Sequence, residues 1–383
     1  MFRIEAEKLL VGLVITVIVM ADMLGTTMIS EVVPNIPSLI IILTSLLLLV
    51  RLKNIKIFPL NYLVFAPLIL LTAFIVSYHT KNYIFLSHMI LLVFLYEVDL
   101  QYILKVYSIV GTIFLIVVVC LSLMNIIPNL QYLQVRGTGV VTRNSFGFIY
   151  PTDFASHCFY LYITISYLFK ERYIVLRSIV GLAMAAFILK FCDARLNVLS
   201  IIASVLIFIF FYFYNNKFRK IFSILPFSII ASSGLMYYLT KNFTWSNPFY
   251  VFVNDLFSMR LWLGNEALKK YAVQLFGNPE VNFIGYGGKT ESVFSYNYVD
   301  SSYIQMLFYY GSLIVVLLII LYLVRSWVIY KQRNYLLLTL LALITWNCMI
   351  EAFWIRPSYN IFFYALFAST APVLTHNLDG NGK

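Results

Sequence analysis

The run YILKVYSIVGTIFLIVVVCLSLMNII, residues 102–127, decides the fold class of this chain. A helix needs about 20 apolar residues to cross the hydrocarbon core of a bilayer, and this run exceeds that length with Lys105 as its single charge. The rest of the chain has the same character. Of its 383 residues, 62% are hydrophobic and 11% are charged, and the mean hydropathy is +0.88. These values are typical of a polytopic membrane protein and lie outside the range of soluble domains.

Comparable apolar runs recur along the whole sequence, and we expect twelve spans. They cover residues 9–29, 37–50, 58–78, 83–96, 102–127, 146–169, 176–191, 196–214, 221–239, 302–324, 335–353 and 358–374. The first run is too long for a removable signal peptide and is followed by further runs, so we interpret it as a span. The prediction is an all-α, polytopic integral membrane protein with a single transmembrane domain over residues 1–383.

Basic residues indicate the orientation of this domain. They gather in short connections on the side of the N-terminus: Arg51, Lys53, Lys56, Lys170, Arg172, Arg177, Lys217, Arg219, Lys220, Arg325, Lys331 and Arg333. The positive-inside rule makes that side cytoplasmic, and an even number of spans places both termini there. Because these residues supply most of the net charge of +11, the basic balance does not indicate nucleic-acid binding.

The opposite side carries one long connection, residues 240–301, between the ninth and tenth predicted spans. Its stretch FSMRLWLGNEALKKYAVQLF (257–276) alternates apolar and polar positions at helical spacing, with Arg260 at the edge of the apolar face. The connection is too short for a domain with its own core, so we expect it to pack on the bundle as a lid.

Arginines on the extracytoplasmic side need a reason, because orientation signals do not account for them. Arg136, Arg143, Arg195 and Arg260 could converge, and the planar guanidinium fork matches phosphate oxygens bidentately. We expect a site for a diphosphate. For the pair Asp193 and Arg195, mutual pairing or snorkelling at the interface is the alternative.

Three further side chains are candidates for acid–base chemistry. Asp300 opens a predicted span, where it is either a helix cap or a carboxylate placed to accept the proton of a hydroxyl. Asp153 and His157 lie in VRGTGVVTRNSFGFIYPTDFASH (135–157). The polar groups of this stretch could line a substrate cavity. The alternative is that Asp153 forms an interfacial ion pair with Arg143 and that His157 is a core histidine. The pair Glu97 and Asp99 falls on the cytoplasmic side and is interpreted as a solvated turn, and the four cysteines show no metal or disulfide spacing.

Over residues 130–325 the order of motifs resembles the O-antigen polymerase and ligase family, which includes capsular and exopolysaccharide repeat-unit polymerases. Four pieces carry the resemblance: the Arg136-Gly-x-Gly segment leading to Asn144 and Pro151, the turn at Arg195, the Arg260, Trp262 and Ala267 segment with its Gly285–Gly288 turn, and the Asp300–Tyr303 entry with Gly311. The chain departs from the family pattern at Tyr150 and Thr152, where relatives often have His and Asn.

The resemblance implies a glycosyltransferase in a bacterial cell (inner) membrane that joins undecaprenyl-diphosphate-linked oligosaccharide repeat units on the extracytoplasmic face. Inverting transfer without cofactor or metal is implied, with a chain-length regulator and a flippase as candidate partners beside membrane lipids. The four outer arginines would bind the diphosphate, Asp300 would be the first choice of base before His157 and Asp153, and Asn144, Asp193 and Tyr303 would line the substrate cavity.

Three other functions remain open on the sequence. Ligases of this family carry a His near the position of Asp300, and its absence here favours a polymerase over a ligase. A lipid-linked oligosaccharide flippase or other transporter could also have twelve spans and a basic cavity, although no internal repeat is evident. A non-catalytic scaffold would not need the outer arginines.

Overall fold

The computed structural model describes residues 2–31, 36–47, 60–136, 139–169, 172–214, 220–287 and 296–370. The chain is mostly helical, as predicted. Six helical segments of the described residues are long and apolar enough to cross a membrane: Tyr62–Thr80, Leu100–Leu123, Ile174–Cys192, Arg195–Tyr214, Ile221–Lys241 and Ser312–Lys331. Three shorter apolar helices accompany them, at Ser38–Leu47, Tyr83–Phe94 and Tyr335–Asn347.

The elements follow the predicted runs closely over most of the chain. In order they are α1 (Phe2–Leu24), η1 (Met28–Glu31), α2 (Ile36–Leu47), α3 (Leu60–Thr80), α4 (Tyr83–Phe94), α5 (Leu100–Leu123), β1 (Gln131–Arg136), β2 (Gly139–Asn144), α6 (Pro151–Phe169), α7 (Ile174–Cys192), α8 (Arg195–Tyr214), η3 (Ile221–Phe227), α9 (Ser228–Lys241), α10 (Pro248–Leu256), α11 (Arg260–Lys270), α12 (Ser302–Tyr309), α13 (Ser312–Lys331), α14 (Tyr335–Asn347) and η4 (Ile361–Leu366).

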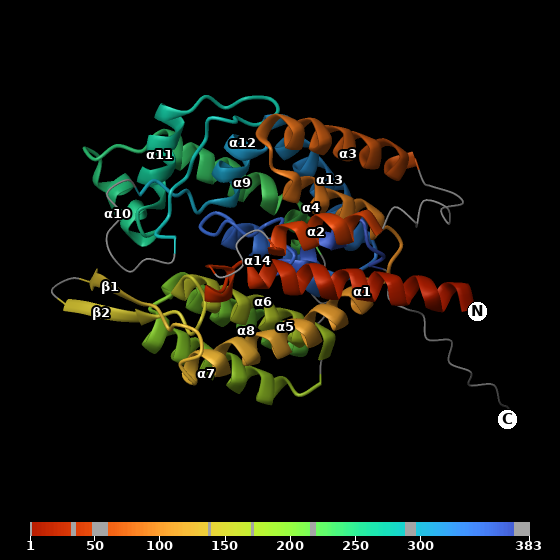
Figure 1. Cartoon of the computed structure of the whole chain (residues 1–383), viewed down its shortest axis with the longest axis horizontal. Coiled ribbons are helices and arrows are strands. Elements are labelled where there is room, and N and C mark those ends of the chain that lie inside the picture. Colours follow the sequence, from red (N-terminus) through yellow and green to blue (C-terminus); the bar gives the residue numbers. More distant parts are fainter. Residues whose placement is uncertain are drawn as a thin grey trace.

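The helices form two groups around a middle layer (Figure 1). Helices α1, α2 and α14 run through the middle, α5 to α8 pack on one side, and α3, α4, α9 and α11 to α13 pack on the other. The hairpin β1–β2 and helices α10 and α11 lie at one end of the molecule, and the start of α1 lies at the opposite end. The segments predicted to face away from the N-terminus therefore come together.

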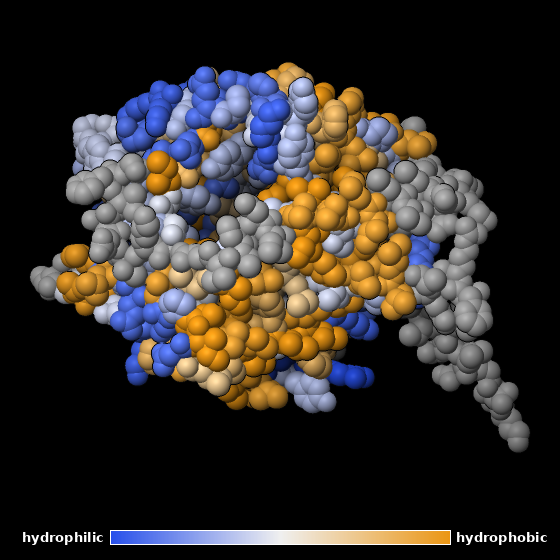
Figure 2. Space-filling view, in the orientation of Figure 1, coloured by the Kyte–Doolittle hydropathy of each residue, from blue (hydrophilic) through white to orange (hydrophobic). Residues whose placement is uncertain are grey.

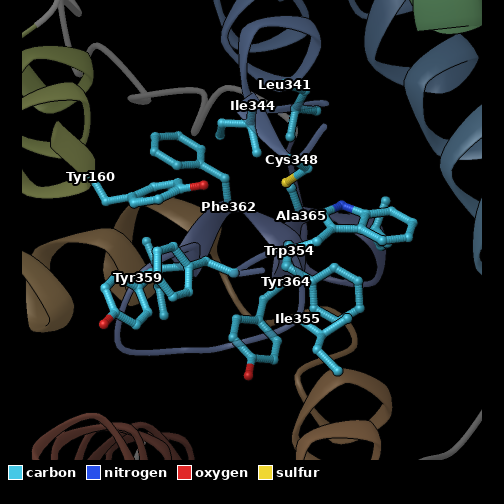
Figure 3. Close-up of a cluster of buried hydrophobic side chains, with 14 of the residues drawn as sticks. Tyr160, Leu341, Ile344, Cys348, Trp354, Ile355, Tyr359, Phe362, Tyr364 and Ala365 are labelled. Atoms are coloured by element: carbon cyan, nitrogen blue, oxygen red, sulfur yellow. The ribbon is translucent and has the colours of Figure 1, made fainter. Parts of the chain in front are cut away.

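Aromatic side chains fill the centre of the bundle (Figure 3). Tyr160 of α6 and Phe362 of η4 meet Leu341 and Ile344 of α14, and all four are at most 3% exposed. The predicted last span, 358–374, is wrong as a continuous helix, because it contains only the short η4 within a buried irregular segment. Hydropathy alone does not separate a buried apolar run from a spanning one; residues 371–374 lie outside the described part.

The predicted span 302–324 is divided into two helices, α12 and α13. Gly311 separates them with a φ of +87°, and a Cβ there would lie 2.3 Å from the backbone of Gly277 and Leu275. The backbone of residues 274–278 fills the break, since the amide of Ser312 donates to the carbonyl oxygen of Gln274 (3.0 Å). The sequence run is continuous in hydropathy, so only the backbone geometry reveals this break.

Among the described residues, a β-hairpin departs from the all-α prediction. Strands β1 and β2 pair antiparallel with Tyr132 opposite Arg143, around the Arg136-Gly-x-Gly segment. The hydroxyl of Tyr132 donates to the carbonyl oxygen of Ile149 (2.7 Å), which holds the hairpin against the start of α6. Gly137 lies outside the described residues.

The predicted lid helix is shorter than expected and more deeply buried. Helix α11 begins at Arg260, after Met259 with a φ of +69°, and ends at Lys270. Asn265, a polar residue of this helix, is 4% exposed and donates to the carbonyl oxygen of Thr240 (2.9 Å). This bond ties α11 to the end of α9. A second short helix, α10, precedes it in the same connection.

Candidate functional site

Irregular segments from distant parts of the sequence converge at the end of the bundle that carries the hairpin, α10 and α11. Thr27 and Phe148 form a β-bridge, and the amide of Ser302 donates to the carbonyl oxygens of Cys348 (3.0 Å) and Glu351 (3.2 Å). Figure 2 shows a hollow on this face of the molecule, with hydrophilic side chains along one part of its border and hydrophobic side chains along another. Irregular backbone among apolar helices is tolerated where it is buried in protein or lines a cavity. This convergence of irregular segments is therefore the candidate functional site.

Arg260 lies at the centre of the charged groups found there. Its side chain is 9% exposed, with Nε 3.3 Å from Asp300 Oδ2 and Nη2 3.9 Å from Glu351 Oε1. Its one hydrogen bond within the described residues runs from Nη1 to the carbonyl oxygen of Phe257 at 3.4 Å, and its buried Nε has no hydrogen-bond partner there. Charge-assisted hydrogen bonds measure about 2.7–2.9 Å, so this guanidinium holds donors in reserve.

The surroundings of Asp300 and Arg260 raise the pKa of both side chains. Burial raises the pKa of Asp300, although Arg260 and Arg143 act in the opposite direction. Burial alone would lower the pKa of Arg260, but the carboxylates of Asp300 and Glu351 raise it above its ordinary value. Arg260 therefore stays cationic, and Asp300 is a stronger base than an exposed aspartate.

Glu351 is held from the opposite side by α8. It is 3% exposed, and Asn197 donates to its Oε1 (3.1 Å) in the amide orientation that also lets Asn197 accept from Ser156 Oγ (2.7 Å). Through its contacts with Asn197 and Arg260, Glu351 joins two predicted spans, 196–214 and 335–353, to the long connection 240–301.

The other predicted arginines lie around this centre with partners of their own. Arg143 donates through Nε to the carbonyl oxygen of Cys192 (2.8 Å), which brings the hairpin to the turn between α7 and α8. Arg195 pairs with Asp193 at 3.0 Å and is 57% exposed, as the pairing alternative anticipated. Asn144 donates to the carbonyl oxygen of Phe191 (3.2 Å) and so anchors the hairpin. The side chain of Arg136 lies outside the description.

Three predicted residues are engaged inside the bundle. His157 is fully buried, with Nε2 3.1 Å from Thr26 Oγ1 and Nδ1 3.2 Å from the carbonyl oxygen of Ser358. Asp153 at the start of α6 accepts a hydrogen bond from the Tyr359 hydroxyl (3.0 Å). Tyr303 is 2% exposed and donates to the carbonyl oxygen of Thr345 (2.7 Å). Both ring nitrogens of His157 thus contact protein atoms. Of the two carboxylates beside Arg260, that of Asp300 is the nearer.

A second charged pair, Asp22 and Arg356, lies beside a cavity of about 410 Å³. Arg356 Nη2 is 2.9 Å from Asp22 Oδ1. The sequence analysis missed Asp22, which lies in the first apolar run. An acid inside such a run is the signal that could have found it, because intramembrane carboxylates are costly and need a partner.

Metal ligation is not indicated in the part of the chain that the structure describes, where no group of three or more His, Cys, Asp and Glu side chains could hold an ion. Asp99 instead caps α5 by accepting from the amide of Gln101 (3.0 Å). No family model, curated protein or solved structure matches the chain.

Proposed function

We propose that the chain is a polysaccharide polymerase that joins lipid-diphosphate-linked oligosaccharide repeat units on the extracytoplasmic face of a bacterial cell membrane. In this proposal it crosses the bilayer about twelve times with both termini in the cytoplasm, and residues 240–301 lie outside. The described bundle, with its six long apolar helices and three shorter ones, supports a membrane location.

The observation that carries the proposal is the position of Arg260 beside Asp300. A buried guanidinium with unused donors lies 3.3 Å from a carboxylate whose pKa burial raises. Glycosyl transfer from a lipid diphosphate needs a cation for the leaving group and a base for the acceptor hydroxyl. Both types of group are present here on neighbouring segments.

The proposed reaction uses these two groups in one step. Asp300 takes the proton of a sugar hydroxyl on one lipid-linked unit while the hydroxyl oxygen attacks the anomeric carbon of the growing chain. The bond between that carbon and the diphosphate oxygen breaks, and the diphosphate leaves with the electron pair. Arg260 and Arg143 stabilise the charge that develops on the leaving group, which lowers the barrier more than it strengthens ground-state binding. Arg195 and Arg136 would act at the outer edge of the diphosphate.

Replacing Arg260 tests the proposal in cells. Arg260→Ala is expected to abolish polymer while single repeat units persist, because the leaving group loses its cation. Lys269→Ala is the matched control, since Lys269 lies on the same helix, is 65% exposed and pairs only with Glu266 among the described residues. Normal polymer length in Arg260→Ala would refute the proposal, as would an equal loss in Lys269→Ala.

A lipid-linked oligosaccharide flippase is the second candidate, and the break between α12 and α13 favours it. Transporters often bind their substrates at discontinuous helices, and Gly311 with its φ of +87° interrupts one here. Loss of the protein separates the two functions. Single units accumulate outside the membrane when a polymerase is missing, and inside when a flippase is missing.

A further inference from the structure

The cavity beside Arg356 has a charged side and an apolar side. Asp22 at the end of α1 and Arg356 form the charged side, and Ser30 and Ser38 add hydroxyl groups. Ile41 of α2 and Ile84 of α4 form the apolar side. Its volume of about 410 Å³ falls in the range of about 300–1,000 Å³ that is usual for small-molecule sites.

Asp22 fixes the position of Arg356, and both of its carboxylate oxygens accept hydrogen bonds from residues 356–358. Oδ1 accepts from Arg356 Nη2 (2.9 Å), and Oδ2 accepts from the amide (3.0 Å) and the hydroxyl (2.5 Å) of Ser358. Asp22 is 5% exposed. It is therefore a positioning residue for the guanidinium and for the backbone of residues 356–358.

Arg356 still has donors to offer. Within the described ranges its Nε and Nη1 donate to no protein atom, its side chain is 33% exposed, and its guanidinium carbon lies 5.4 Å from the centre of the Tyr359 ring. A guanidinium held on one edge by a carboxylate presents its remaining N–H groups in a fixed direction. Such a fork matches the oxygens of a phosphate.

The apolar side of the cavity continues onto the surface of α2. Leu39 and Leu43 on that helix are each 56% exposed. Figure 2 shows hydrophobic surface over α2 and its neighbours running up to the border of the hollow. A ligand seated at Arg356 with a hydrocarbon chain would have an apolar path away from the charged side, along helices that lie in the bundle.

We propose that this cavity binds the phosphate head of a membrane lipid, with Arg356 holding the phosphate and Ile41 and Ile84 contacting the start of the chain. A free phosphate shares the head chemistry but would leave the apolar side empty. Neither Arg260 nor Asp300 is among the residues that line this cavity, and the proposal does not depend on the reaction assigned to them.

The test measures binding of geranyl diphosphate to the full chain in detergent by native mass spectrometry, which counts bound molecules. The double variant Asp22→Asn/Arg356→Gln removes both charges together and avoids an unpaired buried carboxylate. We expect its affinity for one bound molecule to fall about 10- to 100-fold, the loss that follows from removing charge-assisted hydrogen bonds. Arg172→Gln, an exposed arginine between α6 and α7, is the matched control and should bind as wild type does.

Two further arms keep the result decisive. Ile84→Trp narrows the cavity without changing its charge and should also weaken binding of geranyl diphosphate at least tenfold. This variant still tests the site if the double variant does not fold. Inorganic diphosphate should bind at least tenfold more weakly than geranyl diphosphate. Unchanged affinity in both variants would overturn the site, and equal affinity for the two ligands would overturn the assignment to a lipid.

Discussion

Removing the Arg260 guanidinium should destabilise the protein in a pH-dependent way. Arg260→Met keeps most of the side-chain volume but leaves Asp300 and Glu351 facing one another without a cation. Glu351 is 4% exposed and Asp300 28% exposed in their side chains, so little water can take the place of the guanidinium. Breaking a buried ion pair by removing one partner costs about 3–5 kcal/mol in free energy of unfolding. We expect the lower end, about 3 kcal/mol, because the two contacts are long and Asp300 is partly hydrated.

The sign of the pH dependence follows from the carboxylates. The penalty is complete where both carboxylates are charged; as the pH falls they take up protons, and the difference in free energy of unfolding between Arg260→Met and wild type shrinks. Thermal unfolding in detergent between pH 5 and pH 8 measures this difference. The double variant Arg260→Met/Glu351→Gln should recover part of the loss at pH 8. A penalty that stays constant with pH, or that grows toward pH 5, would refute this reasoning.

Three other outcomes are expected. Asp300→Asn should stop polymer formation. Wild-type activity should fall as the pH drops through the pKa of Asp300, with a midpoint above the ordinary value of about 3.9 because burial raises that pKa. A pH–rate profile in membranes checks this, and a rate that does not change with pH contradicts the assignment of the base. Gly311→Ala should prevent proper folding, since the φ of Gly311 is +87° and a Cβ there would lie 2.3 Å from backbone atoms. Gly234→Ala, where a Cβ would meet nothing within 4 Å, should stabilise α9 by about 1 kcal/mol in free energy of unfolding. Expression and thermal unfolding compare the two variants. Tyr303→Phe should cost about 1–3 kcal/mol of stability through the unpaired carbonyl of Thr345 while polymer length stays normal, and shortened polymer would instead give Tyr303 a substrate role.

The helical bundle could be predicted because apolar length is written directly into the sequence. The run that forms α5 was expected to end near residue 127 and ends at Leu123, and α8 matches its predicted range within one residue. The pattern failed where the same hydropathy serves another purpose. The apolar run at 358–374 packs into the core as η4 and irregular backbone, and the run at 302–324 is interrupted at Gly311.

The charged centre was only partly accessible from the sequence. Arg260 and Asp300 were singled out separately, and their approach to 3.3 Å depends on how residues 271–301 fold back on the bundle, which no local spacing encodes. Asp22 and Arg356 are separated by more than 300 positions, so their pairing follows from tertiary packing alone. Asn265 shows the limit of a helical wheel, because a polar side chain can face inward where carbonyl oxygens at a helix end accept its hydrogen bonds.

The central claim, that this chain elongates lipid-linked glycans, is tested most directly by reconstitution. The purified protein is placed in vesicles with a single lipid-diphosphate-linked repeat unit, and the glycan length and the released lipid diphosphate are measured together. A polymerase yields products of two or more repeat units and releases one lipid diphosphate for each bond formed, and we expect neither in Arg260→Ala. Single units that stay unjoined, or that only change sides of the membrane, would contradict it.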